Sequence, residues 1–321
     1  MRRAAALALL VALATPALAQ EPRTEAKPPE PALRPTDAPG VAAPAPDLAF
    51  GAFQRGYFVT ALKEAMKRIE ANPGDAAAMT LVGELYGQGL GMKRNPQEAA
   101  RWFRLAADRG DRQAIFALGL AQLRGEGVAR DRAGGLALLE KAAGMGHAGA
   151  SYNLGVAALE NDGVTSQFAK AAEHFRSAAD LGDSDAAYSL GLLYKTGKGV
   201  EKDERKAAEW IGRAASDNNL AAIVELAIMQ FNGEGVEKDE TAAARLFLKA
   251  AGRNSPIAQN RVARLLAAGR GLPRDTVEAM KWHLLARVAG LQDHWLDSTL
   301  AALSPQEKAQ VEDAVRKYVG N

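Results

Sequence analysis

The sequence has no cysteine among its 321 residues. This absence excludes disulfide bonds, thiolate metal sites, a cysteine nucleophile and a lipidated cysteine after the N-terminal segment. The chain also lacks the motif spacing of a Ser/His/Asp triad and a nucleophile elbow. Its paired carboxylates are scattered, as expected of charged, solvent-facing helices. The sequence therefore predicts that the protein is not an enzyme.

Histidine is scarce, with four residues at positions 147, 174, 283 and 294. His174 and His283 fall in or beside a recurring tryptophan position, so packing explains them better than catalysis. His294 could form a metal site with Asp293 and Asp297, but three ligands on one short helix rarely converge without a second element. We therefore expect no metal and no cofactor.

The N-terminus reads MRRAAALALLVALATPALAQ, in which Arg2 and Arg3 precede an apolar run too short to span a bilayer. The triplet that ends at Ala19 is a small-x-small cleavage site. These features predict a Sec-type signal peptide over residues 1–19, with an uncleaved membrane anchor as the alternative. We expect a periplasmic or secreted protein that has no stable membrane insertion after cleavage.

The expected mature chain carries no excess of positive charge. Of the 40 basic side chains, two lie in the predicted signal, which leaves 38 basic against 38 acidic side chains. Nucleic acid is therefore an unexpected partner, since binding it requires a basic surface. Residues 20–46 hold eight of the fourteen prolines. This composition predicts an extended or disordered linker, a tether, with a proline-motif ligand as the alternative.

A small residue recurs every 36 residues through the rest of the chain, at Gly83, Gly119, Gly155, Gly191, Ala227 and Ala263. A second recurring feature is a residue pair, at Gly89/Gly91, Gly125/Gly127, Asn161/Gly163, Gly197/Gly199, Gly233/Gly235 and Gly269/Gly271. Glycines followed by a helix also suggest a phosphate-binding loop. However, the chain lacks the Lys-Ser/Thr of a P-loop and the preceding strand of a dinucleotide site. Six copies without insertion indicate a repeat array.

Each 36-residue unit predicts two antiparallel helices. In the fourth unit, apolar residues at helical spacing predict a first helix over 185–196. The expected N-caps of the second helices are Asn95, Asp131, Gln167, Asp203, Asp239 and Asp275. The expected left-handed stops are Gly110, Gly146, Gly182, Asn218, Asn254 and Gly290. Gly134 and Gly135, inside one second helix, should cost about 1 kcal/mol each relative to alanine.

The pattern A-x-x-x-L-G-x-x-Y-x-x-G-x-G-V-x-x-D-x-x-K-A-x-x-W-x-x-x-A-A fits residues 186–215. It resembles the Sel-1-like repeat, a relative of the tetratricopeptide repeat, and the resemblance covers six copies over 76–291. Residues 47–75 resemble a degenerate tetratricopeptide hairpin, and 292–321 are expected to form capping helices. The resemblance implies an all-α, right-handed α/α superhelical solenoid of helical hairpins.

By analogy with tetratricopeptide arrays, the first helix of each unit lines the concave face. Two inward columns then predict a partner-binding surface formed by Phe116, Leu123, Tyr152, Leu159, Tyr188, Lys195 and Phe231. These side chains are expected to seat an extended peptide or an amphipathic helix. The alternative is that they pack one first helix on the next.

The resemblance implies a protein-interaction scaffold in the cell envelope. Adaptor roles of this kind include assembling secretion or polysaccharide machinery and restraining the periplasmic sensor of a signalling kinase. The alternative is a cell-wall or β-lactam binding protein or hydrolase, like some secreted relatives. Those relatives carry paired cysteines in each repeat, and this chain has none.

Overall fold

The computed structural model describes residues 47–160 and 165–320. The predicted signal peptide, the proline-rich linker and the loop pair Asn161/Gly163 lie outside the described residues. The described part contains sixteen α-helices and no strand. The helices are α1 Leu48–Gln54, α2 Phe58–Ala71, α3 Ala76–Gln88, α4 Pro96–Ala107, α5 Arg112–Arg124, α6 Arg132–Gly144, α7 Ala148–Glu160, α8 Thr165–Asp180, α9 Ser184–Thr196, α10 Glu204–Ser216, α11 Leu220–Asn232, α12 Glu240–Ala251, α13 Pro256–Ala268, α14 Thr276–Val288, α15 His294–Ala301 and α16 Pro305–Val319.

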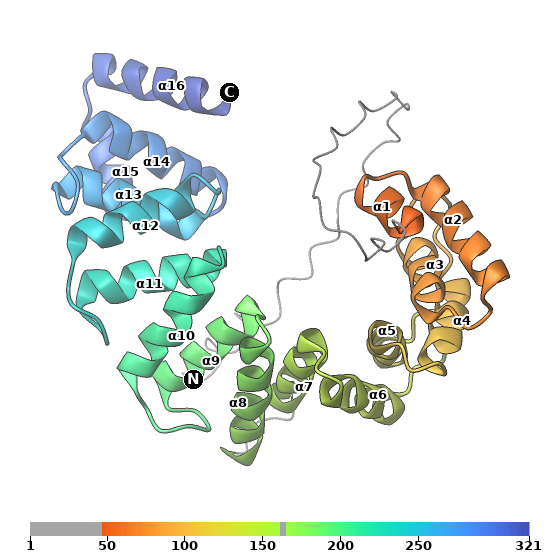
Figure 1. The fold of residues 1–321 in the computed structure, drawn as a ribbon. Helices are drawn as coiled ribbons and strands as arrows, with labels where there is room; N and C mark the ends of the chain where they lie inside the picture. Colours follow the sequence, from red (N-terminus) through yellow and green to blue (C-terminus); the bar gives the residue numbers. More distant parts are fainter. Residues whose placement is uncertain (1–46, 161–164, 321) are drawn as a thin grey trace, which may run out of the picture.

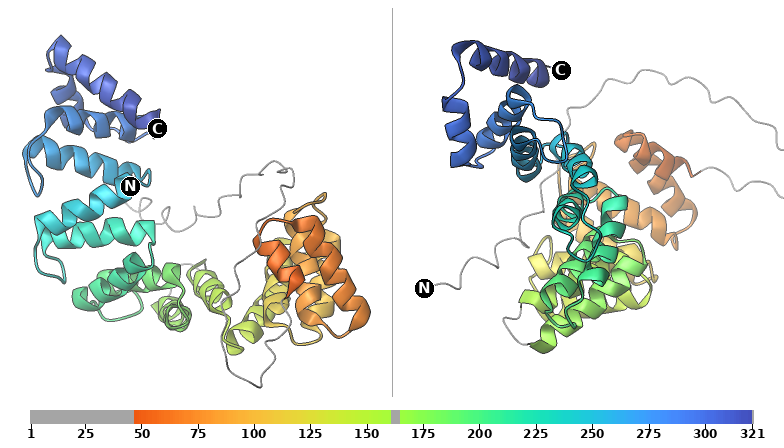
Figure 2. Two further views of the ribbon diagram at one scale, coloured as in Figure 1. Left: turned by 45° about the horizontal axis from the view of Figure 1, so that its top comes forward. Right: turned by 90° about the vertical axis from the view of Figure 1, so that its left-hand side faces the viewer.

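The helices stack in chain order and form a curved array (Figure 1). From α1 to α14, each helix packs against the one before it and the one after it. Two further views show the array winding out of a single plane as it proceeds (Figure 2). This arrangement confirms the predicted all-α, right-handed solenoid of helical hairpins.

The residue that recurs every 36 positions is small because two helices of one repeat approach each other there. A Cβ atom added at Gly83 would lie 2.6 Å from the ring of Phe103. One added at Gly155 would lie 2.6 Å from the ring of Phe175, which is fully buried. At Gly83 and Gly155 the first helix therefore offers a bare backbone against which the second helix packs a large side chain.

Side-chain caps start the helices as the sequence predicts in five of the six second helices. Asn95, Asp131, Asp203, Asp239 and Asp275 each accept a hydrogen bond from a first-turn backbone amide. The prediction for Gln167 is wrong, because α8 already begins at Thr165 and Gln167 lies inside its first turn. Glutamine is a poor N-cap, since its longer side chain does not close the short ring that Asp and Asn form.

The first helices carry a cap column that the sequence analysis missed. Their N-cap side chains belong to Asp75, Asp111, Asp183, Asn219 and Ser255. The predicted stops at the ends of the second helices have the expected left-handed backbone. Asn218 and Asn254 are the non-glycine residues with positive φ in the described segments, at 61° and 60°.

The C-terminal end of the array is covered by α15 and α16. Ser304 and Glu307 form the reciprocal capping box that opens α16. This helix packs on α14, where the rings of Trp282 and Tyr318 lie 5.2 Å apart in an edge-on arrangement. Val311 of α16 is buried in the same core. The last full hairpin therefore does not end on an open apolar face.

Across residues 47–160 and 165–320, no helix combines the length and the apolar character that crossing a membrane requires.

Candidate interaction surface

The first helices of the repeats, α3, α5, α7, α9, α11 and α13, together form what we call the first-helix face. All seven residues predicted to bind a partner lie on these helices, and each is half-buried. They follow one another from α5 to α11 along the array. Their contacts within the protein differ: Phe116 and Tyr152 lie against aromatic rings, and Lys195 forms ion pairs.

Phe116 of α5 is covered on one side by His147, the residue directly before α7. Its ring stacks on the imidazole of His147, with the ring centroids 4.2 Å apart. Nε2 of His147 also lies 2.8 Å from the side-chain oxygen of Gln113. Phe116 therefore contributes to packing between repeats, and only its uncovered side is open to a partner.

The tyrosines at the middle of the face are partly engaged in the core. Tyr152 lies 5.7 Å from the buried ring of Phe175. Burial raises the pKa of the Tyr188 hydroxyl to about 12, and the nearby charge of Glu225 acts in the same direction. Tyr188 therefore presents an un-ionised phenol at physiological pH.

Lys195 is held by two carboxylates of the next repeat. Its ammonium lies 2.7 Å from Glu225 and 2.9 Å from Glu234. Burial would lower the pKa of Lys195, but the hydrogen bonds to Glu225 and Glu234 raise it above its ordinary value. The lysine thus links α9 to the following repeat and is not a free cation.

The C-terminal end of the face contains a pocket of about 380 Å³ between α11, α13 and α15. Its aromatic walls are Phe231, the last of the predicted residues, and Trp295, whose exposed fraction is 48%. The apolar floor includes Phe247 of α12, which is buried. Three arginines, Arg261, Arg264 and Arg270, also line the pocket.

Two of these arginines each contact an aromatic ring and donate hydrogen bonds to a carboxylate. The guanidinium of Arg270 lies 4.5 Å from the centre of the Phe231 ring and donates to Glu240 through Nε and Nη2. Arg264 lies 5.6 Å from the Trp295 ring and donates to Asp293 through the same two nitrogens. Paired contacts of this kind hold a guanidinium plane in one orientation.

Asp293 connects α13 to α15 at this end of the face. It caps α15, and it accepts hydrogen bonds from Arg264 and from the Asn260 amide at 2.8 Å. Burial alone would raise the pKa of its carboxyl. The hydrogen bonds from Arg264, Asn260 and the Leu296 amide outweigh burial and lower the pKa to about 2.

The sequence analysis missed the arginine pocket. Arg264 and Asp293 are 29 positions apart, and the pairing arises only when α15 folds back beside α13. A departure from the pattern was nevertheless visible. Arg264 follows the small residue Ala263 directly, where the earlier repeats have Glu84, Leu120, Val156, Leu192 and Ile228.

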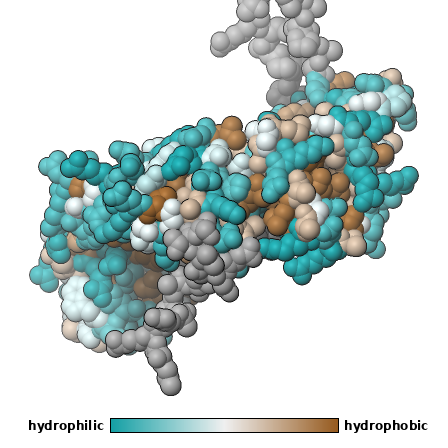
Figure 3. Space-filling view, turned by 90° about the horizontal axis from the view of Figure 1, so that it is seen from below, coloured by the Kyte–Doolittle hydropathy of each residue, from teal (hydrophilic) through white to brown (hydrophobic). Residues whose placement is uncertain are grey.

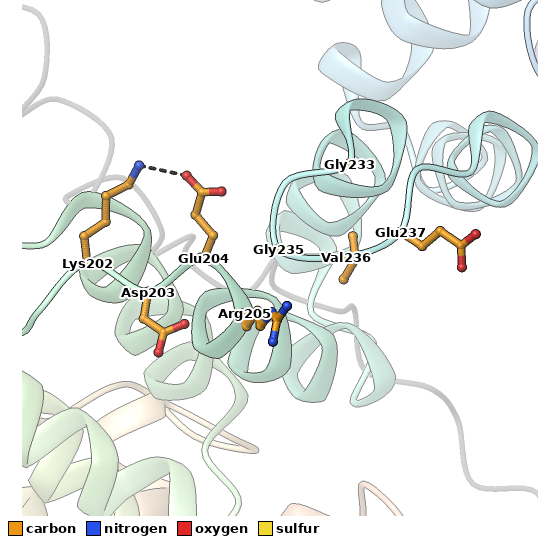
Figure 4. A pocket seen from close by; sticks show the side chains of 8 residues that line it. All are labelled: Lys202, Asp203, Glu204, Arg205, Gly233, Gly235, Val236 and Glu237. Atoms are coloured by element: carbon orange, nitrogen blue, oxygen red, sulfur yellow. Dashed lines mark hydrogen bonds and ion pairs between the residues drawn. The ribbon is translucent and has the colours of Figure 1, made fainter.

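A second hollow lies at the edge of the array, between the loops of the fourth and fifth repeats (Figure 4). Charged side chains of both signs line it, and the ammonium of Lys202 points to Glu204 at 2.7 Å. Lys202 and Arg205 face Asp203, Glu204 and Glu237 there, so the hollow offers no excess of positive charge to an anion. Figure 3 shows a further side of the molecule, on which hydrophobic side chains form separate patches among hydrophilic ones.

His283, Asp293 and Asp297, near the C-terminus, form structural contacts. His283 is fully buried, and its Nε2 lies 2.9 Å from Asp297. Within the described ranges, no three His, Asp or Glu side chains are grouped closely enough to hold a metal ion. Asp293 and Asp297 thus have partners on α13 and α14.

Comparison with known families gives one match. A family model described as the Sel1 repeat matches residues 76–111, 112–147, 148–183, 184–219, 220–255 and 256–287. No curated protein matches the chain.

Solved structures with the same fold support this match. A Sel1 repeat protein from Oxalobacter formigenes is 28% identical, with a TM-score of 0.67, over 75% of this chain and 98% of its own. The protein c5321, a protective antigen of uropathogenic Escherichia coli with an SLR fold, is 26% identical with a TM-score of 0.50. That alignment covers 82% of this chain and 64% of the antigen.

Proposed function

The chain belongs to the Sel1 repeat family, and we propose that it is an exported scaffold whose first-helix face holds a protein partner in the bacterial cell envelope. Sel1 repeat proteins are generally protein-interaction scaffolds and are typically not catalytic. The observation that carries the proposal is the run of half-buried aromatic and aliphatic side chains at equivalent positions of successive first helices. A partner that covers this run would bury its remaining apolar area.

Export is proposed from the first 19 residues. Two arginines, a short apolar run and a site ending at Ala19 have the order of a cleaved signal. The proline-rich segment that follows would then act as a tether. N-terminal sequencing of the protein recovered from a periplasmic fraction tests this part, and a mature chain beginning at Gln20 is the expected result. A full-length chain in the cytosol would contradict it.

The proposed roles are those of an adaptor: a restraint on the periplasmic sensor of a signalling kinase, or a connector in envelope assembly machinery. In both, the array is a preformed surface, so binding requires little ordering of the scaffold itself. The partner then determines which process is affected.

The experiment is capture of partners from a periplasmic extract on immobilised residues 20–321, followed by mass spectrometry. Tyr152→Ala and Tyr188→Ala test the face, and Trp210→Ala is the matched control. Trp210 lies on the second helix α10, where Arg213 stacks on its ring at 5.4 Å. We expect a partner retained by the parent chain and by Trp210→Ala, and lost from the tyrosine variants.

Circular dichroism of each variant separates binding from packing. Retained helicity with loss of the partner supports the proposal. If the tyrosine variants unfold, the side chains serve the core and the packing alternative holds. If they bind as the parent does, the partner uses another surface and the proposed face is wrong.

A further inference from the structure

We propose that the pocket between α11, α13 and α15 captures the C-terminal carboxylate of a partner chain whose last residue is apolar. This inference rests on the proposed scaffold function and names the chemistry of the partner. It is carried by the charge of the pocket lining, by the free donors of its arginines and by the short distance between the charged and apolar parts of one cavity.

The charged side chains that line the pocket are all positive. It contains Arg261, Arg264 and Arg270 and no carboxylate. The acids that pair with two of these arginines lie outside the lining: Asp293, whose side chain is 3% exposed, and Glu240 of α12, whose side chain is 27% exposed. Among the described residues, Arg261 makes no ion pair. Arg261 therefore gives the pocket a positive charge that no carboxylate of the described residues offsets, and this charge favours an anion.

Each arginine has donors left for a ligand. Arg264 and Arg270 both use Nε and Nη2 for their carboxylates, so their Nη1 groups have no partner within the described structure. The side chains of Arg264 and Arg270 are 46% and 49% exposed. Arg261 offers its whole planar fork, the geometry that suits a carboxylate.

The apolar part of the pocket lies beside these donors. Phe231, Ile228 and Leu265 line the same cavity of about 380 Å³. A ligand must therefore place an apolar side chain and an anion within a few ångströms of each other. A C-terminal residue does this, because its carboxylate and its side chain leave the same Cα atom.

An internal acidic residue suits the pocket less well. In an extended peptide, neighbouring side chains point to opposite faces, so an acid and its apolar neighbour cannot both enter one cavity. Residues two positions apart share a face, but their separation of about 6.6 Å exceeds that within one residue. We therefore infer a chain terminus and not an acidic stretch.

The test uses fluorescence polarisation of the full mature chain, residues 20–321, with labelled hexapeptides of the form Gly-Ser-Gly-Ser-Gly-Z, where Z is Phe, Leu or Val. Each peptide is made with a free C-terminal carboxylate and as its amide. We expect the free acids to bind and amidation to weaken binding about tenfold or more, since hydrogen bonds to a charged group are lost. A peptide with an internal Glu and an amidated end should behave as the amides do.

Arg261→Gln should weaken binding of the free acids about tenfold and leave the amides unchanged. The matched control is Arg245→Gln, since Arg245 is an exposed arginine of α12 outside the pocket lining. Equal binding of acid and amide, or no binding of either form, would overturn the proposal. Binding of the internal-Glu peptide as tightly as the free acids would also overturn it.

The scaffold function and the pocket can fail separately. If the chain captures an envelope partner through the tyrosine positions while acid and amide peptides do not differ, the pocket proposal is wrong and the scaffold stands. If the free acids bind through Arg261 but no envelope partner is captured, the pocket is confirmed and the scaffold proposal is wrong.

Discussion

Gly235 in the loop of the fifth repeat lies directly against the main-chain carbonyl of Glu204 in the fourth. A Cβ atom at Gly235 would lie 1.9 Å from that oxygen, and φ of Gly235 is 69°. The same relationship joins Gly127 to Pro96 and Gly271 to Glu240. The second loop glycine is thus the point at which one repeat rests its loop on the first helical turn of the preceding repeat.

Gly235→Ala should destabilise the array by about 2 to 4 kcal/mol, because backbone strain and overpacking both act at this position. Urea unfolding followed by circular dichroism measures the change. Gly110→Ala is the control, since Gly110 has a φ of 81° but no neighbour within 4 Å of an added Cβ. The control should lose only the strain energy. Equal losses in the two variants would show that the contact with Glu204 contributes nothing.

Gly135 has a packing role that opposes its poor helix propensity. A Cβ atom there would lie 2.8 Å from Leu123 and 2.9 Å from the carbonyl oxygen of Gly119. Gly135→Ala should therefore destabilise the protein by about 1 to 2 kcal/mol despite the better helix former. Gly212→Ala, in the middle of α10 with open space around it, should stabilise by about 0.5 to 1 kcal/mol. The same urea unfolding gives both values, and a stabilised Gly135→Ala would contradict the packing role.

Asp293 makes the C-terminal end of the array sensitive to acid. Its pKa in the folded protein is about 2, below that of an ordinary aspartate, so the unfolded chain binds more protons as the pH falls. The stabilising effect is complete above about pH 4 and is lost as the pH falls through about 2.

Asp293→Asn should cost about 1 to 2 kcal/mol at neutral pH, because charge-assisted bonds with Arg264 become neutral ones. It should also flatten the decline in stability between pH 4 and pH 2. Thermal unfolding midpoints measured from pH 6 to pH 2 check both effects. A variant with the same acid slope as the parent would show that other carboxylates cause the decline.

Most of the fold could be predicted from the sequence because its rules are local and repeat. Asp203 four places after Gly199 predicts a helix start, and Asn218 predicts a stop, without knowledge of distant contacts. The prediction that Gln167 caps a helix was wrong. The Asp or Asn found at this position in the other repeats is missing, and α8 already begins at Thr165.

The site was less predictable, because it depends on contacts between repeats. The seven chosen positions do lie on first helices, but their binding role stays a prediction. The sequence does not show that Lys195 is neutralised by Glu225, or that Phe116 stacks on His147. Gly135 shows the same limit. Its cost in helix propensity can be predicted from the sequence, whereas its close packing against α5, the first helix of the same pair, cannot.

His147 occupies the N-cap position of α7, where the neighbouring repeats have Asp111 and Asp183. Its Nδ1 accepts a hydrogen bond from the Ala150 amide at 3.1 Å. The hydrogen on Nε2 is then available to the side-chain oxygen of Gln113, at 2.8 Å. An imidazole can fill this capping role only while Nδ1 carries no proton.

Burial lowers the pKa of His147, and the nearby charge of Arg112 lowers it further. The folded protein therefore resists protonation more than the unfolded chain, and the stabilising effect of the cap is complete above about pH 6.5 and lost as the pH falls below it. His147→Asp restores the cap of the other repeats, and an aspartate stays ionised at pH 5. Relative to the parent, the variant should gain about 1 kcal/mol between pH 7.5 and pH 5, although it loses the stacking on Phe116 at both pH values. Urea midpoints at pH 7.5, 6 and 5 check this, and a parent and variant that decline in parallel would show that the cap does not titrate.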